Sequence, residues 1–72
     1  MDSIGERAVK AIKRHVKKGE LGIELKNLDI PTCTFNSWMN GRNNPSAYYL
    51  KRMTLAGYDV IWILTGKENK NA

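Results

Sequence analysis

An all-α fold in one domain is predicted for this chain, both by the breaks that divide it and by the apolar spacing between them. Glycine, asparagine and proline recur at short intervals, and no segment between them alternates like a strand. The pattern predicts a compact bundle of five helices over residues 1–66. A charged, apolar-poor tail, 67–72, is expected to be disordered. The length of 72 residues leaves room for one modest hydrophobic core.

The first helix is predicted to begin at Ser3 and to end at Gly19. Ser3 and Glu6 have the spacing of a capping box. The predicted buried arc consists of Ala8, Val9, Ile12 and Val16. The opposite arc, the basic arc, carries Arg7, Lys10, Lys13, Arg14, Lys17 and Lys18. It is either the solvated side of an amphipathic helix or a surface for phosphate groups, and the solvated interpretation is the commoner one.

The second helix is predicted over about Glu20–Leu28, and a turn at Asp29 follows it. Aspartate tolerates the backbone conformation of a sharp turn better than most residues other than glycine. Ile30 is expected to fill the space between the second helix and the third. Pro31 should start the third helix, with Thr32 as its cap.

The third helix, which ends at Asn40-Gly41, is predicted to have one buried and one exposed face. Phe35 and Trp38 fall together on the buried side because residues three apart are neighbours on a helix. The opposite, polar face consists of Thr32, Cys33, Asn36 and Ser37. A short helix with such a face is how a helix-turn-helix protein builds the helix that enters the DNA major groove. The face carries no Lys, Arg or Gln.

Two further helices are predicted after the polar loop Arg42-Asn43-Asn44. Pro45-Ser46 is a start signal for the fourth helix, and Gly57 ends it. Asp59 should cap the fifth helix, which Gly66 closes. The inward-facing residues of the fourth helix are predicted to be Tyr49, Leu50 and Met53; Leu50 and Trp62 are expected to be mostly buried, like Phe35 and Trp38.

Charge and composition restrict the possible functions. Twelve Lys and Arg against seven Asp and Glu give a net charge of +5, which favours a polyanionic partner. The single cysteine allows no internal disulfide and fits a reducing compartment. The longest apolar run, 60–64, is far short of a membrane span. These features lead us to expect a cytoplasmic protein with no membrane partner.

No catalytic site, cofactor site or metal site is predicted. The chain has no nucleophile–base pairing, no paired carboxylates and no glycine-rich phosphate loop. His15 is a lone imidazole without a cluster of ligands around it. The sequence therefore favours a binding protein over an enzyme.

From about Ile4 to Gly66 the chain resembles the helix-turn-helix domains of phage repressors and Cro proteins. The features that carry the resemblance, in order along the chain, are Ile4-Gly5-Glu6-Arg7, Leu28-Asp29-Ile30-Pro31, Trp38 before Asn40-Gly41, Pro45-Ser46, and Gly57 before Trp62-Ile63-Leu64-Thr65-Gly66. The resemblance implies a five-helix fold and a role in a phage lysis–lysogeny switch. It also implies binding to double-stranded operator DNA, usually as a homodimer.

Position by position, the resemblance assigns DNA-contacting roles to two sets of residues. The base-reading sites of the family correspond to Thr32, Cys33, Asn36 and Ser37. The sites that contact the DNA backbone correspond to Asn40, Arg42, Asn43 and Asn44.

Three positions depart from the pattern of the family. The second helix usually opens with a glutamine that touches DNA, whereas Glu20 and Leu21 stand here. Leu25 replaces the small residue that normally lets the second and third helices approach closely. Pro31 replaces the usual Ser or Thr cap of the third helix.

A second function from a different class stays open. In size and switch-protein character the chain also resembles the modulator-of-repression antirepressors of temperate phages, which inactivate a phage repressor by binding it. A protein interface on the third helix would use Phe35, Trp38 and Met39 if they were partly exposed. An antitoxin-like role is a third, weaker alternative.

Overall fold

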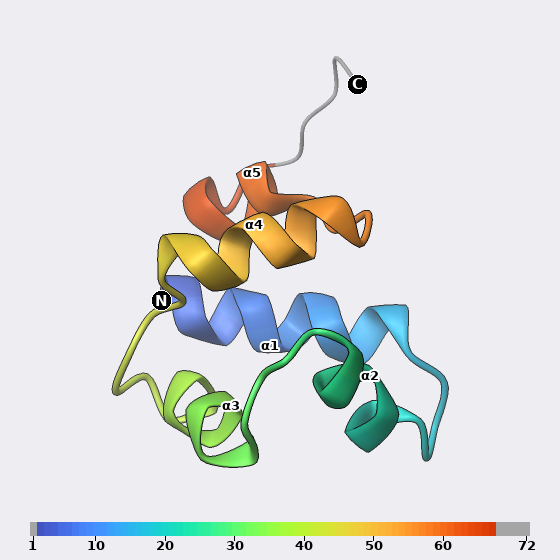
Figure 1. Cartoon of the computed structure of the whole chain (residues 1–72). Coiled ribbons are helices and arrows are strands. Elements are labelled where there is room, and N and C mark those ends of the chain that lie inside the picture. The colour runs from blue at the N-terminus through green and yellow to red at the C-terminus, as the bar shows by residue number, and fades with distance from the viewer. Residues whose placement is uncertain (1, 68–72) are drawn as a thin grey trace.

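The computed structural model describes residues 2–67 and is all-helical over that range (Figure 1). The five helices are α1 (Ile4–His15), α2 (Leu21–Asn27), α3 (Thr32–Met39), α4 (Ala47–Leu55) and α5 (Val60–Thr65). No strand occurs within residues 2–67, so the predicted fold class is confirmed at the level of an all-α bundle of five helices. Except for Lys67, which is exposed, the tail predicted to be disordered lies outside the described residues.

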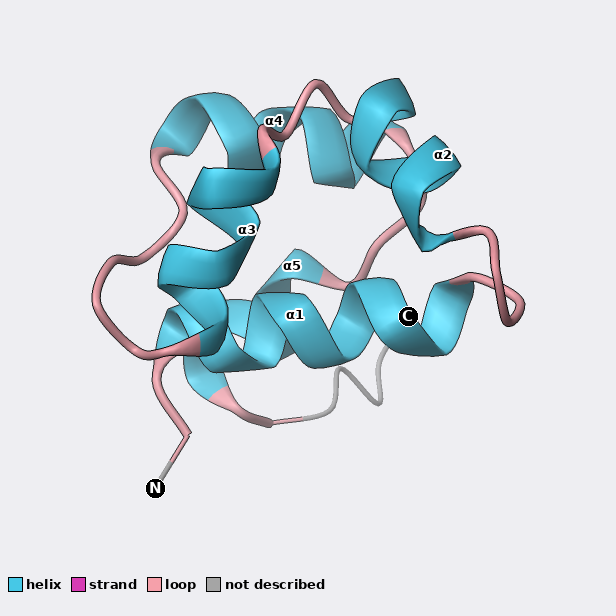
Figure 2. Ribbon diagram, turned by 90° about the horizontal axis from the view of Figure 1, so that it is seen from below, coloured by secondary structure: helices cyan, strands magenta, loops and turns pink. Residues whose placement is uncertain are grey.

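Helix α1 is the centre of the bundle. Figure 1 shows α2 and α3 on one side of it and α4 and α5 on the other, and Figure 2 shows the α2–α3 side from below. Helix α1 packs against α2, α3 and α5, and α4 packs against α5. Because α1 is covered from both sides, Ala8 and Ile12 on its apolar arc are fully buried.

The sequence predicts the start of α1 correctly but not its end. The capping box at its start is formed, with Ser3 Oγ accepting from Glu6 N and Glu6 Oε1 accepting from Ser3 N. The predicted end at Gly19 is wrong, since the helix stops at His15. Val16 is extended, with φ −98° and ψ 154°, and Gly19 has a φ of +88° in the turn that follows. The chain must reverse here to bring α2 back against α1, and two cations of the predicted basic arc consequently lie in a turn.

The turn between α2 and α3 is held by several contacts. Asp29 has a φ of 59°, as expected of an aspartate in a sharp turn, and its carboxylate accepts a hydrogen bond from the Tyr48 hydroxyl at 2.8 Å. Ile30 is buried, as predicted. Arg52 donates to the carbonyl oxygens of Asn27 and Leu28, which lie at the C-terminal end of α2. This turn is therefore fixed from α4 as well as from its own residues.

The prediction that Thr32 caps α3 is wrong. Pro31 occupies the N-cap position in an extended conformation, with φ −61° and ψ 147°, and Thr32 is the first helical residue. No side chain bonds the free amides at this end of α3. The hydroxyl of Thr32 is therefore not engaged in capping.

Of the four large residues that were predicted to be mostly buried, two are confirmed fully. Phe35 and Trp38 are 3% and 1% exposed, whereas Leu50 and Trp62 are only partly buried at its edge. The buried residues of the hydrophobic core are Ala8, Val9, Ile12, Leu25, Leu28, Ile30, Phe35, Trp38, Met53, Tyr58 and Ile63. Leu25 is thus part of the core, at the position where the family has a small residue.

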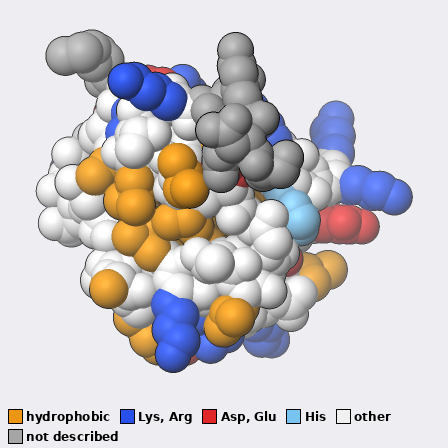
Figure 3. All heavy atoms as spheres, turned by 90° about the horizontal axis from the view of Figure 1, so that it is seen from above, with side chains coloured by type: hydrophobic (Ala, Val, Ile, Leu, Met, Phe, Trp, Pro, Cys, Tyr) orange, Lys and Arg blue, Asp and Glu red, His pale blue; other side chains and the backbone are white. Residues whose placement is uncertain are grey.

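Helix α5 is short and presents apolar side chains outward. Asp59 caps it by accepting from Trp62 N, and Gly66 ends it in the left-handed conformation, both as predicted. Ile61 and Leu64 are about half exposed, and Figure 3 shows apolar side chains gathered on the side of the molecule formed by α4 and α5. None of the helices within residues 2–67 has the length and apolar character needed to cross a bilayer.

Candidate nucleic-acid interface

The outer face of α3 brings the four predicted base-reading residues together. Thr32, Cys33 and Asn36 are exposed and Ser37 is partly exposed. Their position is set from beneath, because Phe35 and Trp38 hold the opposite side of the helix in the core. Cys33 is a free, exposed thiol and therefore does not pack in the core.

The polar side chains of this face make no hydrogen bonds with the rest of residues 2–67. Every side-chain hydrogen bond in that range uses other residues, most of them at helix ends and turns. The hydroxyl of Thr32, the amide of Asn36 and the hydroxyl of Ser37 therefore meet only solvent or a ligand. A side chain with free donors and acceptors on a rigid helix is available for recognition.

The loop after α3 is held by hydrogen bonds at both of its ends, although its side chains are exposed. The carbonyl oxygen of Ser37 accepts from the backbone amides of Arg42 and Asn43, at 2.9 and 3.4 Å. The side-chain oxygen of Asn44 accepts from Gly5 N at 3.0 Å. Asn44 is exposed, but this oxygen is already used inside the protein, which leaves its amide nitrogen for any contact with DNA.

Gly5 has a close packing role that its sequence position alone does not reveal. A Cβ placed there would lie 2.5 Å from the carbonyl oxygen of Asn43 and 3.1 Å from the Cα of Trp38. Helix α1 can therefore approach α3 and its following loop only because residue 5 has no side chain. This approach places the loop residues next to the polar face of α3.

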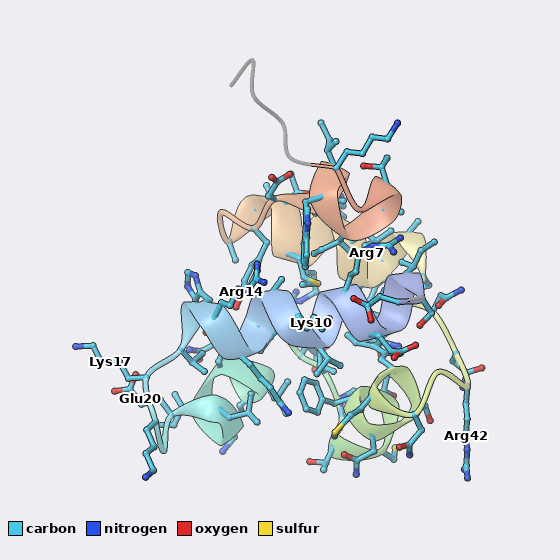
Figure 4. All side chains as sticks on the ribbon, turned by 180° about the vertical axis from the view of Figure 1, so that it is seen from behind. Arg7, Lys10, Arg14, Lys17, Glu20 and Arg42 are labelled. Atoms are coloured by element: carbon cyan, nitrogen blue, oxygen red, sulfur yellow. The ribbon has the colours of Figure 1, made fainter. Side chains whose placement is uncertain are left out.

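Arg42 is the cation that stands beside that face. Together with Asn40 and Asn43 it is exposed, and Figure 4 shows its side chain extending away from the loop between α3 and α4. Neither Arg42 nor these two asparagines form a side-chain hydrogen bond or ion pair within residues 2–67. The guanidinium can reach a phosphate without breaking an existing contact.

The basic arc of α1 is, in contrast, partly used to hold the fold. Arg7 donates to the carbonyl oxygens of Ile63 and Leu64 at the end of α5, at 2.8 and 3.1 Å, and to that of Asp2. Lys10 forms an ion pair with Asp2, whose pKa its ammonium group lowers. Figure 4 shows Arg7 pointing from α1 toward α5. At these two positions the arc is neither simply solvated nor free for phosphates.

Glu20 brings negative charge to the start of α2. It is the exposed N-cap residue of this helix, with no side-chain cap bond, and Figure 4 places it beside Lys17 in the turn after α1. In the family pattern this region carries a DNA-contacting glutamine, which a carboxylate cannot replace as a hydrogen-bond donor.

A cluster of His15, Glu24 and Tyr58 was not predicted from the sequence. The Tyr58 hydroxyl donates to Glu24 Oε2 at 2.5 Å, and the His15 ring lies 4.6 Å from the Tyr58 ring and 3.7 Å from the same carboxylate. Burial and the bond to Glu24 raise the pKa of the tyrosine hydroxyl. The three residues come from distant parts of the chain, so no local pattern could have indicated them.

Comparisons with known protein families, with curated proteins and with solved structures found no match to this chain. Among residues 2–67 no three His, Cys, Asp or Glu side chains are placed to hold a metal ion. The geometry of the α3 face and of the loop beside it is therefore the basis for assigning a function.

Proposed function

We propose that this protein is a phage-type transcriptional regulator of a lysis–lysogeny switch, which binds operator DNA through a helix-turn-helix formed by α2, the turn at Asp29, and α3. One observation carries the proposal: the polar side chains of α3, together with those of Asn40, Arg42 and Asn43 after it, are at least partly exposed side by side and form no hydrogen bonds within residues 2–67. Elsewhere in the fold, many polar side chains bond helix ends and turns. The face available for recognition is thus the one that would enter the major groove.

Asn36 is the main base-reading residue of this proposal. Its amide can bond N6 and N7 of an adenine as a bidentate pair, which is worth about 1–3 kcal/mol of discrimination against another base. Thr32 and Ser37 supply hydroxyls, and the thiol of Cys33 suits contact with a thymine methyl group.

Residues of the loop position the protein on the DNA backbone. Arg42 binds a phosphate, and Asn40 and Asn43 donate from their amides to neighbouring phosphates. Asn44 contributes through its amide nitrogen, since its oxygen already bonds Gly5. The net charge of +5 adds a favourable long-range term for a polyanion.

The second candidate is an antirepressor that binds the DNA-binding domain of a phage repressor. This candidate is favoured by the acidic Glu20 and by two exposed apolar side chains. Ile23 on α2 is 63% exposed and Met39 on α3 is 39% exposed. Phe35 and Trp38, which the sequence offered as its anchors, are buried and unavailable. The positive net charge also opposes docking onto a surface that itself binds DNA, because like charges repel. Binding to operator DNA therefore remains the first candidate function.

The test is selection of binding sites from a random duplex library, followed by measurement of affinity for wild type and for Asn36→Ala. Wild type should enrich a defined sequence. Asn36→Ala should lose about 1–3 kcal/mol of selectivity at one base pair while binding non-selected DNA unchanged. Ser46→Ala is a matched control, since Ser46 is exposed, starts α4 and makes no side-chain cap bond.

A parallel measurement separates the two candidates. A repressor encoded beside this protein is tested for complex formation with wild type and with Ile23→Glu. If wild type enriches no sequence yet captures the repressor, and Ile23→Glu abolishes the capture, the DNA-binding proposal is wrong and the antirepressor candidate replaces it.

A further inference from the structure

A surface cleft lies between the C-terminal half of α1 and the turn that joins α4 to α5. Its volume is about 510 Å³, within the range of about 300–1,000 Å³ that is typical of ligand sites. The residues that define its chemistry are Ala11, Arg14, His15, Tyr58, Asp59 and Trp62. It is not part of the α3 face described above.

The walls of the cleft combine aromatic surface with cationic groups. Tyr58 and Trp62 supply aromatic rings, and Ala11 leaves space between α1 and α5 because its side chain is a single methyl group. The guanidinium carbon of Arg14 lies 5.1 Å from the centre of the Trp62 ring. An apolar side chain of a partner can therefore contact these rings while a charged neighbour reaches the rim.

Among the residues that line the cleft, Arg14 is the one with a permanent positive charge. Arg14 forms no ion pair with an acidic group of residues 2–67, and its exposed neighbours Lys17 and Lys18 follow in the turn after α1. The carboxylate of Asp59, which also lines the cleft, accepts a hydrogen bond from the backbone amide of Trp62. Positive charge next to an aromatic cleft is complementary to acidic residues next to an apolar one.

We infer that this cleft is a docking site for an acidic segment of a protein partner. An aromatic or branched apolar side chain of the segment occupies the cleft, and a carboxylate beside it binds Arg14. The inference goes beyond the proposed function and does not depend on whether α3 binds DNA.

Duplex DNA fits the cleft less well than such a segment does. Phosphates would satisfy the cations but bring no apolar group for the Tyr58 and Trp62 rings, and the bases of a duplex stay stacked. Figure 4 shows Arg14 directed toward the α5 side of α1, whereas Arg42 extends in another direction from the far end of α3. DNA on α3 and a protein segment in the cleft would therefore occupy different parts of the surface.

The test uses the full chain, isotope-labelled for NMR, and the acetylated, amidated peptide Asp-Glu-Phe-Leu-Asp-Glu as a probe. Titration should shift the amide signals of Ala11, Arg14 and Tyr58 and the indole N–H of Trp62. Arg14→Glu should weaken binding at least tenfold. Lys13→Glu makes the same change of charge on the same helix outside the cleft and should weaken it no more than about threefold. Ala11→Met, which fills the cleft without changing charge, should also weaken it at least tenfold.

Three results would each overturn the inference. One is a titration with no shifts, or with shifts centred on α3 and Arg42. Another is equal loss of affinity in Arg14→Glu and Lys13→Glu, which would mean unspecific attraction. The third is equal binding of a peptide in which serine replaces both apolar residues. Thermal unfolding of every variant shows that it is folded, and Asn36→Ala should bind the peptide like wild type, which separates this test from that of DNA binding.

Discussion

Helices α1 and α3 both carry polar side chains along one face but use them differently. On α1, Glu6 completes a capping box, Arg7 bonds the end of α5, and Lys10 pairs with Asp2. On α3, the side chains of Thr32 and Asn36 bond nothing else within residues 2–67. The more charged helix is thus the structural one, and the less charged helix is the available one. Charge density alone therefore does not indicate which polar side chains are free to bind a partner.

The largest effect is expected from removing the residue that fixes α3 in place. Trp38→Ala should lower the free energy of unfolding by about 3–5 kcal/mol, because the ring is 1% exposed and leaves a cavity. Urea unfolding followed by circular dichroism measures the change. The neighbouring Met39→Ala should cost less than about 1 kcal/mol, since this side chain is 39% exposed. Equal losses at the two positions would contradict the assignment of a buried and an exposed side to α3.

The next effect concerns the contact between the two helices. Gly5→Ala should lower stability by about 1–3 kcal/mol, because the added methyl group meets the carbonyl oxygen of Asn43. Gly22→Ala is its control: nothing lies within 4 Å of a Cβ there, and α2 should gain about 0.5–1 kcal/mol. Thermal unfolding of both variants measures the two changes in stability. A Gly5→Ala variant as stable as wild type would show that the approach of α1 to the loop is not tight.

A third comparison sets Arg7 against Arg42. Arg7→Ala should lower stability by about 1–2 kcal/mol, since it leaves the carbonyl oxygens of Ile63 and Leu64 without their charged donor. Arg42→Ala should leave stability unchanged within about 0.5 kcal/mol. It should instead reduce the dependence of DNA affinity on salt by about one unit of the log–log slope. If Arg7→Ala weakens DNA binding without loss of stability, α1 takes part in recognition after all.

The smallest effect is a dependence on alkaline pH that the cluster around Tyr58 produces. Because the pKa of Tyr58 is raised in the folded state, the unfolded chain releases this proton near pH 10 while the folded chain keeps it. Stability should therefore be unaffected by this group below about pH 10 and fall as the pH rises above it, by up to about 1.4 kcal/mol per pH unit. Urea unfolding at pH 9 and pH 11 measures the fall. Tyr58→Phe should make it shallower, and an identical fall in this variant would assign it to other groups.

The sequence alone determined that five helices occur within residues 2–67 and which residues cap three of the helix ends. Ser3, Asp59 and Gly66 act at helix ends through bonds to their own neighbours, so their effect is readable from local spacing. The polar face of α3 was predictable for the same reason, because helical periodicity places Asn36 on the side opposite Trp38 whatever surrounds the helix. Asp29 belongs with them because aspartate tolerates a positive φ better than most residues, although contacts from α4 also hold its turn.

Only the tertiary structure decided which of these local features are used inside the molecule. The early end of α1 at His15, the close approach at Gly5 and the bonds of Arg7 to α5 all depend on where distant segments lie. The same holds for Asn44, whose side-chain oxygen bonds a residue 39 positions away. Periodicity reports which side of a helix a residue is on. Whether a polar group there is bonded internally or left for a partner depends on the packing of the other helices, because hydrogen-bond partners in a bundle come from segments that only folding brings together.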